Sequence, residues 1–177
     1  MRETFVLSPP LFLFILFSCI VGNQPLFLAV IALLHGISYG LALNLTCCAD
    51  IRVCTRSTRF SLKEVDIGIA ADLGALTRLP KVVGSMGWVK EVAYTCREFD
   101  GAEAQRVGFA NTVCEDKVAA WEQCLEMARA VVAKSPVAIE STKELLDWGV
   151  GRPVVDGEYL FSLCISHPFP PFFSLGE

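Results

Sequence analysis

Between residues 26 and 115, short apolar segments alternate with glycines, prolines and polar turns. The run 26–34 is apolar and ends at His35-Gly36, so it predicts a short buried strand. Residues 51–54 and 60–62 predict two further short strands that a polar turn separates. Strands that alternate with helices along a chain are typical of a layered α/β fold.

Helices are predicted between and after these strands by apolar composition and by residues that start or stop a helix. A short apolar helix is expected at 41–48. A second helix begins near Ala70 and ends at Pro80, because proline cannot continue a helix. Ser85 is a suitable N-cap for a third helix that runs through Thr95.

The later part of the chain is predicted to be mainly helical. Asp100 and Glu103 have the spacing of a capping box for a helix at 102–107. Apolar residues recur at helical spacing through 121–132, and Ser135-Pro136 begins a last helix, with serine at the cap and proline in the first turn. We therefore expect helices to follow the α/β part.

Three regions are predicted from these patterns. The middle region, 34–148, carries the strands and helices described above. It follows a hydrophobic N-terminal segment at 1–33, part of which is the predicted core strand. The region 149–177 has no clear period and contains several prolines, so we expect an irregular tail.

The N-terminal segment leaves a membrane alternative open. A single basic residue, Arg2, precedes an apolar run at 11–21 whose length fits a signal-peptide core better than a membrane span. Joined with 26–34, this run would just span a bilayer as one kinked helix without charge. We favour two separate runs, and an anchor or membrane contact through 11–34 remains the alternative.

Composition and charge exclude two classes of function. The 177 residues suffice for one domain with a core, and the net charge of −4 comes with no basic stripe, which excludes nucleic acid as a partner. Eight cysteines without a C-x-x-C pair and only two histidines give no spacing for zinc, so we expect no metal. Most of the cysteines are interpreted as small buried thiols in a reducing compartment.

Three acids lie in an otherwise apolar and glycine-rich stretch, "FSLKEVDIGIAADLGALTRLPKVVG" at 60–84. Glu64 and Asp72 are eight residues apart with Gly68 between them, so the two carboxylates can face one cavity from two walls. Paired carboxylates in an apolar pocket repel each other, so one holds a proton while the other does not. Such a pair suits the transfer of protons along a carbon skeleton.

A purely structural interpretation of these acids is also open, and spacing alone favours it. Asp72 would cap a helix, where the helix dipole favours a negative charge. Glu64 would form an ion pair with Lys63 or Arg78. Asp66 is expected to be a turn or salt-bridge residue.

The residues "HGISYGLALNLTCCADIRVCTRSTRFSLKEVDIGIAADLGALTRLPKVVG" resemble the enoyl-CoA hydratase/isomerase (crotonase) superfamily, and most closely its dienoyl-CoA isomerase branch. The resemblance covers about residues 34–148. The element Cys48–Arg52 is shared across the superfamily, whereas the "AAD" triplet that ends at Asp72 is the more specific signal. The resemblance implies an α/β, crotonase-like (ClpP/crotonase) spiral core, incomplete here, followed by C-terminal helices.

The resemblance also implies an activity and a set of site residues. Glu64 and Asp72 match the acids that move protons between the two ends of a conjugated dienoyl-CoA thioester. The thioester oxygen would be bound by backbone N–H groups, one of them that of Leu41, beside Gly36 and Gly40. Coenzyme A would be part of the substrate, so no cofactor is expected.

This sequence departs from the family pattern near the predicted oxyanion donor. Ile37, Leu41 and Ala42 stand where glycines are usual. Asn44 stands where hydratases have a second glutamate and dienoyl isomerases an aspartate, and we count it among the substrate-binding residues. Because asparagine cannot act as a base, this departure argues against the addition of water.

The resemblance further implies a chain truncated in its N-terminal half, since an unrelated apolar segment precedes His35. It implies a homo-oligomer, trimeric or hexameric when complete, and a mitochondrial or peroxisomal location. Two alternatives to an active isomerase remain open. One is a non-catalytic crotonase-like fragment that docks onto other subunits, and the other is a membrane-anchored protein.

Overall fold

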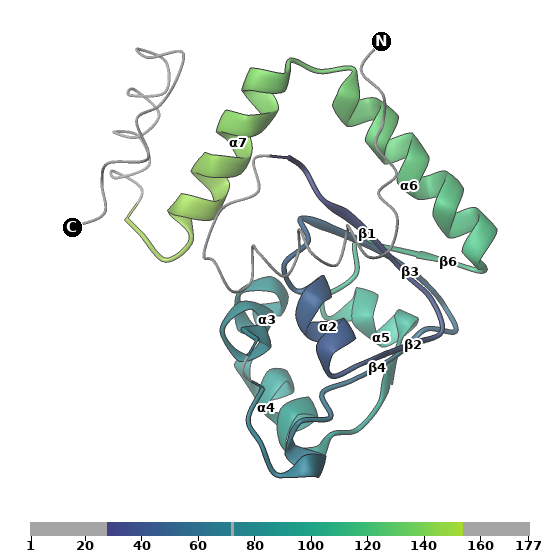
Figure 1. Cartoon of the computed structure of the whole chain (residues 1–177), viewed down its shortest axis with the longest axis vertical. Coiled ribbons are helices and arrows are strands. Elements are labelled where there is room, and N and C mark those ends of the chain that lie inside the picture. The colour runs from purple at the N-terminus through teal and green to yellow at the C-terminus, as the bar shows by residue number, and fades with distance from the viewer. Residues whose placement is uncertain (1–27, 72, 154–177) are drawn as a thin grey trace. The chain divides into compact units, whose positions relative to one another are not determined.

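A computed structural model describes residues 28–71 and 73–153 (Figure 1). These residues divide into two compact units. The first unit contains residues 30–129 and carries all the strands and all the candidate site residues that the structure describes. The second unit combines 28–29 with 130–153.

Two small sheets organise the first unit. Parallel pairing in the order β1-β3-β6 forms one sheet, from β1 (Ile31–Leu34), β3 (Ile51–Thr55) and β6 (Thr112–Cys114). The other sheet has the order β2-β4-β5, from β2 (Ile37–Tyr39), β4 (Arg59–Ser61) and β5 (Phe99–Asp100). In it β2 and β4 are parallel, whereas β4 and β5 are antiparallel. This mixed architecture confirms the predicted α/β class.

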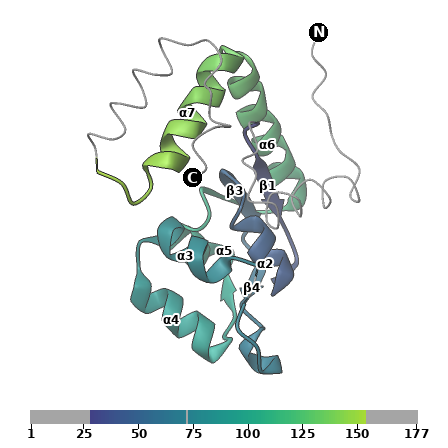
Figure 2. The ribbon, with the colours of Figure 1, turned by 60° about the vertical axis from the view of Figure 1, so that its left-hand side comes forward.

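Helices connect and follow the strands. The elements are α2 (Leu41–Thr46), the 3₁₀ turn η1 (Val65–Ile67), α3 (Ala75–Val83), α4 (Met86–Thr95), α5 (Gly101–Arg106), α6 (Lys117–Val132) and α7 (Pro136–Gly149). Both ribbon views place α3 next to α4 within the first unit, and α2 also contacts α3 (Figures 1 and 2). The helices predicted after residue 115 are thereby confirmed.

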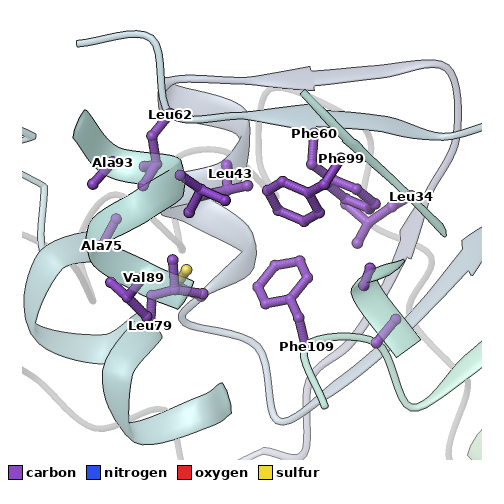
Figure 3. Close-up of a cluster of buried hydrophobic side chains, with 14 of the residues drawn as sticks. Leu34, Leu43, Phe60, Leu62, Ala75, Leu79, Val89, Ala93, Phe99 and Phe109 are labelled. Atoms are coloured by element: carbon purple, nitrogen blue, oxygen red, sulfur yellow. The ribbon is translucent and has the colours of Figure 1, made fainter. Parts of the chain in front are cut away.

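A core of aromatic and aliphatic side chains holds α2 in place (Figure 3). The rings of Phe60, Phe99 and Phe109 contact one another, with centroids 5.1 Å apart for the first two and 6.3 Å apart for the last two. Leu43 of α2 and Leu79 of α3 are fully buried in the same cluster. Burial of such side chains is worth about 1.5–3 kcal/mol each, so α2 and α3 are fixed against the strands.

Arg52 ties the end of α2 to a distant loop. Its guanidinium group donates to the carbonyl oxygens of Ala49 at 2.5 Å and Phe109 at 2.6 Å. The backbone N–H of Arg52 donates to the side-chain oxygen of Asn111 at 2.8 Å. Burial lowers the pKa of Arg52 from its ordinary value. This residue of the superfamily element therefore has a structural role in the described unit.

Local signals located three helix starts correctly, one of them that of α7, where Ser135 accepts a hydrogen bond from the Ala138 N–H. Ser85 caps α4 by accepting a hydrogen bond from the Trp88 N–H, and Asp100 caps α5 by accepting one from the Glu103 N–H. The capping box is only half formed, because the Glu103 carboxylate binds Arg97 and the Trp88 indole N–H. Long-range partners thus replace the expected local one.

The predicted limits of the second helix were wrong at both ends. The helix α3 begins at Ala75 and continues through Pro80 to Val83. Gly68 and Gly74 have φ angles of 80° and 93°, a left-handed conformation that interrupts a right-handed helix, so α3 cannot begin before Gly74. The proline removes a single N–H donor, and tertiary packing of Leu79 offsets that loss.

Strand and helix boundaries also differ from the predictions. Of the run 26–34, the structure describes strand only at Ile31–Leu34, and α2 ends at Thr46 instead of residue 48. The strands β2, β5 and β6, of two or three residues each, were not predicted, whereas β4, also of three residues, was predicted one residue late at 60–62 from its apolar composition. Such strands are too short to show a period of two.

Two predicted features lie largely outside the described residues. The apolar run 11–21 and the tail from 154 onward are not described. Within 28–71 and 73–153, no helix has both the length and the apolar character that crossing a membrane requires. The three-region division therefore stays a prediction, whereas a single kinked helix through 11–34 does not agree with the strand β1 at Ile31–Leu34, which pairs with β3.

Candidate active site

Glu64 is held at the start of the turn η1 by a side chain from α2. Its Oε1 accepts a hydrogen bond of 2.7 Å from the Nδ2 of Asn44. Its Oε2 is buried and has no hydrogen-bond partner among the described residues. One oxygen of this carboxylate is therefore engaged, and the other has no described partner.

Asn44 is the centre of the local hydrogen-bond network. It is 1% exposed, and its Oδ1 accepts a 3.0 Å hydrogen bond from the backbone N–H of Ala75. Its Nδ2 donates to Gly40 O at 3.0 Å as well as to Glu64. Because only the amide oxygen can accept from an N–H group, these contacts fix which way the amide points.

The backbone conformation at position 40 requires a glycine. Gly40 has φ 50° and ψ −116°, a region that L side chains rarely adopt. Its N–H donates to Ser61 O at 3.0 Å, which ties the start of α2 to β4. A Cβ at Gly40 would lie 3.5 Å from Glu64 Oε1, so the backbone of Gly40 closely approaches the carboxylate.

Leu41 is the first residue of α2 and follows Gly40 directly. The first N–H groups of a helix have no partner within it, so the Leu41 N–H is free of intrahelical bonding. Its side chain is 50% exposed, where the family pattern has glycine. The position is compatible with the predicted oxyanion donor.

Gly36 lies apart from this group along the chain, in the turn between β1 and β2. Its φ of 72° explains the glycine, and its carbonyl oxygen accepts from the Arg59 N–H at 2.8 Å. No hydrogen bond between Gly36 and Glu64, Asn44 or Gly40 is present in the described structure. A role for Gly36 in substrate binding stays a prediction.

The predicted partner of Glu64, Asp72, lies outside the described residues. Next to it, Ala71 packs against the main core, and Leu73 O accepts a hydrogen bond from Arg78. Two residues further on, Ala75 is joined to Asn44. The structure therefore brings Glu64, Asn44 and Gly40 together, while the pairing of Glu64 with Asp72 stays a prediction.

Neither ion pair of the structural alternative for Glu64 is formed among the described residues. Lys63 instead pairs with Asp66 at 3.1 Å and also donates to Cys96 O. Its hydrogen bond holds the pKa of Asp66 below the ordinary value, which confirms Asp66 as a salt-bridge residue. Arg78 donates to Leu73 O.

Among the described residues, Cys47, Cys54, Cys96, Cys114 and Cys124 are free cysteines. Burial raises the pKa of Cys47 to about 12 and that of Cys54 to about 11, so these thiols are protonated at neutral pH. Cys96 and Cys124 are buried too, whereas Cys19 and Cys164 lie outside the described residues. No group of three or more His, Cys, Asp or Glu side chains suited to a metal ion occurs in the described ranges.

Sequence reasoning missed the backbone partner that orients Asn44. The N-cap residue of α3 is Gly74, which has no side chain to cap the helix, so Asn44 supplies the cap to the Ala75 N–H from 31 residues away. The only signal in the sequence is the lack of a local cap residue before α3, and it does not identify which distant side chain accepts from the first N–H of the helix.

Comparison with known proteins places this site in a family. The sequence model of the Enoyl-CoA hydratase/isomerase family matches residues 24–158. The mitochondrial delta(3,5)-delta(2,4)-dienoyl-CoA isomerase of Homo sapiens is 43% identical over 114 residues, which are 64% of this chain and 35% of that protein. The peroxisomal enzyme of the same name from Arabidopsis thaliana is 40% identical over 117 residues, 66% of this chain and 42% of that protein.

A solved structure agrees with these relatives. The enoyl-CoA hydratase/isomerase of Cupriavidus metallidurans superposes with a TM-score of 0.76 at 28% identity, covering 90% of this chain and 60% of that one. The chain spans less than half the length of the two curated relatives. Since the family model matches most of its residues and the crotonase-like fold is shared, the chain belongs to the enoyl-CoA hydratase/isomerase family.

Proposed function

We propose that this chain is an isomerase that shifts double bonds in a dienoyl-CoA thioester. The observation that carries the proposal is the Glu64 carboxylate, whose Oε1 is bound by Asn44 while the buried Oε2 has no partner in the described structure. A carboxylate with one free oxygen is suited to take up or release a proton. The relatives named dienoyl-CoA isomerases support the substrate class.

The reaction is a transfer of one proton between two carbons. One carboxylate takes a proton from C2 of a 3,5-dienoyl thioester, and the electrons of that C–H bond form the C2–C3 double bond. The C3–C4 double bond moves to C4–C5, and the electrons of the C5–C6 double bond take a proton at C6 from the second carboxylate. Glu64 serves one end of the diene and Asp72 the other. The starting protonation states of the two side chains are restored when both exchange protons with solvent.

Charge develops on the thioester oxygen during this transfer. The Leu41 N–H, at the start of α2, is the proposed donor to that oxygen. The preceding residue, Gly40, sets the backbone conformation in which the helix begins. One such donor is typically worth about 10²–10³ in rate. The exposed Leu41 side chain borders the same position and would contact the acyl chain or the thioester.

Isomerisation is favoured over hydration by the residue next to Glu64. The addition of water needs a second group that accepts a proton from the water molecule. Asn44 is neutral, and its amide is committed to Ala75, Gly40 and Glu64. Position 44 therefore offers no base that could accept a proton from water.

The setting of this activity follows the relatives. We propose a mitochondrial or peroxisomal location, as in the names of the human and Arabidopsis enzymes. We also propose that the site takes an acyl-CoA thioester without a separate cofactor and that the protein works as a homo-oligomer.

The test is the conjugation of a 3,5-dienoyl-CoA followed in the ultraviolet. The chain should form the conjugated 2,4-product, and Glu64→Gln should slow it by about 10²–10⁴-fold. Asp72→Asn should also slow it. Asp66→Asn is the matched control, because this exposed acid lies two residues away and forms an ion pair with Lys63.

Two outcomes would contradict the proposal. If Glu64→Gln and Asp66→Asn retain equal activity, Glu64 is not the acid or base. If the folded chain shows no conjugation at all, the alternative of a non-catalytic member that docks onto other subunits is favoured instead.

A further inference from the structure

We propose that Asn44 is a positioning residue that commits Glu64 Oε1 and thereby makes Oε2 the oxygen that exchanges the substrate proton. The inference rests on the proposed function, because it specifies how the same site works. It concerns this chain in particular, since Asn44 stands where the family pattern has an acid.

The first argument is the rigidity of the Asn44 side chain. Its amide makes three hydrogen bonds of 2.7 to 3.0 Å, which join the start of α2, the residue before η1 and the start of α3. The side chain is 1% exposed and sits beside the fully buried Leu43 in the same helix. A buried amide with both ends engaged cannot rotate without losing these bonds.

The second argument is the asymmetry that this amide imposes on Glu64. Oε1 receives the Nδ2–H, whereas Oε2 is buried without a described partner. A buried acceptor that lacks a hydrogen bond costs about 1–3 kcal/mol. A proton arriving from a bound substrate at Oε2 would neutralise the oxygen whose negative charge no described donor stabilises, whereas the charge on Oε1 is stabilised by the Nδ2–H of Asn44.

The third argument is charge. The amide of Asn44 adds no negative charge beside Glu64, so the carboxylate meets no like-charged neighbour on α2. The other charged side chains nearby along the chain are engaged elsewhere, Lys63 with Asp66 and Arg78 with Leu73 O. Asp72 lies outside the described residues.

Asn44→Asp is the decisive variant, because it keeps the shape of the side chain. One carboxylate oxygen can still accept from the Ala75 N–H, but the other would face Glu64 Oε1 and Gly40 O, where Nδ2 now donates. Two carboxylates at that distance share a proton. We expect the acid limb of the pH–rate profile to move up by at least about one pH unit.

Asn111→Asp is the matched control. Its side-chain oxygen also accepts from a backbone N–H, that of Arg52, so the same substitution leaves that contact possible. It should leave the acid limb in place. Asn44→Ala removes all three hydrogen bonds, and loss of the cap on α3 also destabilises the fold. The activity of this variant is therefore interpreted only together with its measured thermal unfolding.

A second arm needs no turnover and separates this inference from the proposed function. The Glu64 side-chain carboxyl is followed by ¹³C NMR from pH 3 to about 9 in the unmodified chain and in Asn44→Asp. A midpoint that moves up in the variant supports the contact, even if the chain proves inactive and the proposed function fails. An unmoved midpoint, or an Asn44→Asp enzyme with the original pH profile, would overturn the positioning role.

Discussion

At the scale of single residues, the site has a feature that folding alone does not favour. A buried carboxylate oxygen without a partner destabilises a protein, and Glu64 Oε2 is the only buried side-chain nitrogen or oxygen without one in the described residues. Local departures from good packing or hydrogen bonding gather at functional sites. The orphaned oxygen thus agrees with the role proposed for Glu64.

Buried thiols give a prediction about alkaline pH. Burial raises the pKa of Cys47 from 9.0 to about 12, so the thiol of the folded chain stays protonated where that of the unfolded chain ionises. The contribution of this thiol to stability is complete below pH 9.0 and is lost as the pH rises toward 12.

We expect the free energy of unfolding to fall by up to about 1.4 kcal/mol per pH unit per buried thiol in this range. Urea titrations at several alkaline pH values would measure it, and Cys47→Ala should flatten the slope. Equal slopes in the two proteins would show that Cys47 does not ionise on unfolding.

The sequence was informative about single residues and uninformative about their distant partners. Glu64 and Asn44 could be selected because carboxylate and amide chemistry is visible in the letters and in the resemblance. The hydrogen bond from Ala75 to Asn44 joins residues 31 positions apart. The expected ion pairs of Glu64 with Lys63 or Arg78 do not form because those two side chains contact Asp66 and Leu73 O instead. Neither follows from local spacing.

At the scale of elements, helix starts with side-chain caps were predictable and the uncapped one was not. Ser85 and Asp100 act within three residues of themselves, so the sequence suffices to locate α4 and α5. The start of α3 depends on two glycines with positive φ and on a cap from α2. Tertiary contacts therefore moved this helix five residues from its predicted start at Ala70.

Two helical glycines make a matched pair for testing the packing of α5. A Cβ on Gly101 would lie 2.5 Å from Thr55 O, which is backbone of β3 and cannot move freely. Gly87 in α4 has nothing within 4 Å of the same position. The two sites thus differ in space and not in residue type.

Gly101→Ala should destabilise the chain by about 1–3 kcal/mol through overpacking. Gly87→Ala should be neutral or stabilising by up to about 1 kcal/mol, because alanine favours a helix more than glycine does. Chemical denaturation of both variants measures the difference. A Gly101→Ala protein as stable as Gly87→Ala would mean that α5 does not pack against β3 as described.

At the scale of the whole molecule, each described sheet has an edge strand with one neighbour only. In the sheet β2-β4-β5 the edge strand β2 carries Ile37, which is 65% exposed. An apolar strand edge invites pairing with another chain. We therefore expect the chain to self-associate or to bind other subunits through this edge.

Ile37→Lys should reduce that association, since lysine on an edge strand opposes pairing. Val118→Lys is the control, because Val118 is 71% exposed but lies on α6. Size-exclusion chromatography with light scattering would give the mass of each variant. A monomeric unmodified chain, or equal effects of both substitutions, would contradict a role for the β2 edge.

The account as a whole depends on proton transfer by Glu64. The most direct measurement is deuterium uptake from D₂O at C2 and C6 of a 3,5-dienoyl-CoA, followed by NMR for the unmodified chain and for Glu64→Gln. We predict exchange at both carbons in the unmodified chain and a loss of at least about 10²-fold at one of them in the variant. Unchanged exchange at both carbons in Glu64→Gln would contradict the assignment of Glu64 as the group that carries the proton.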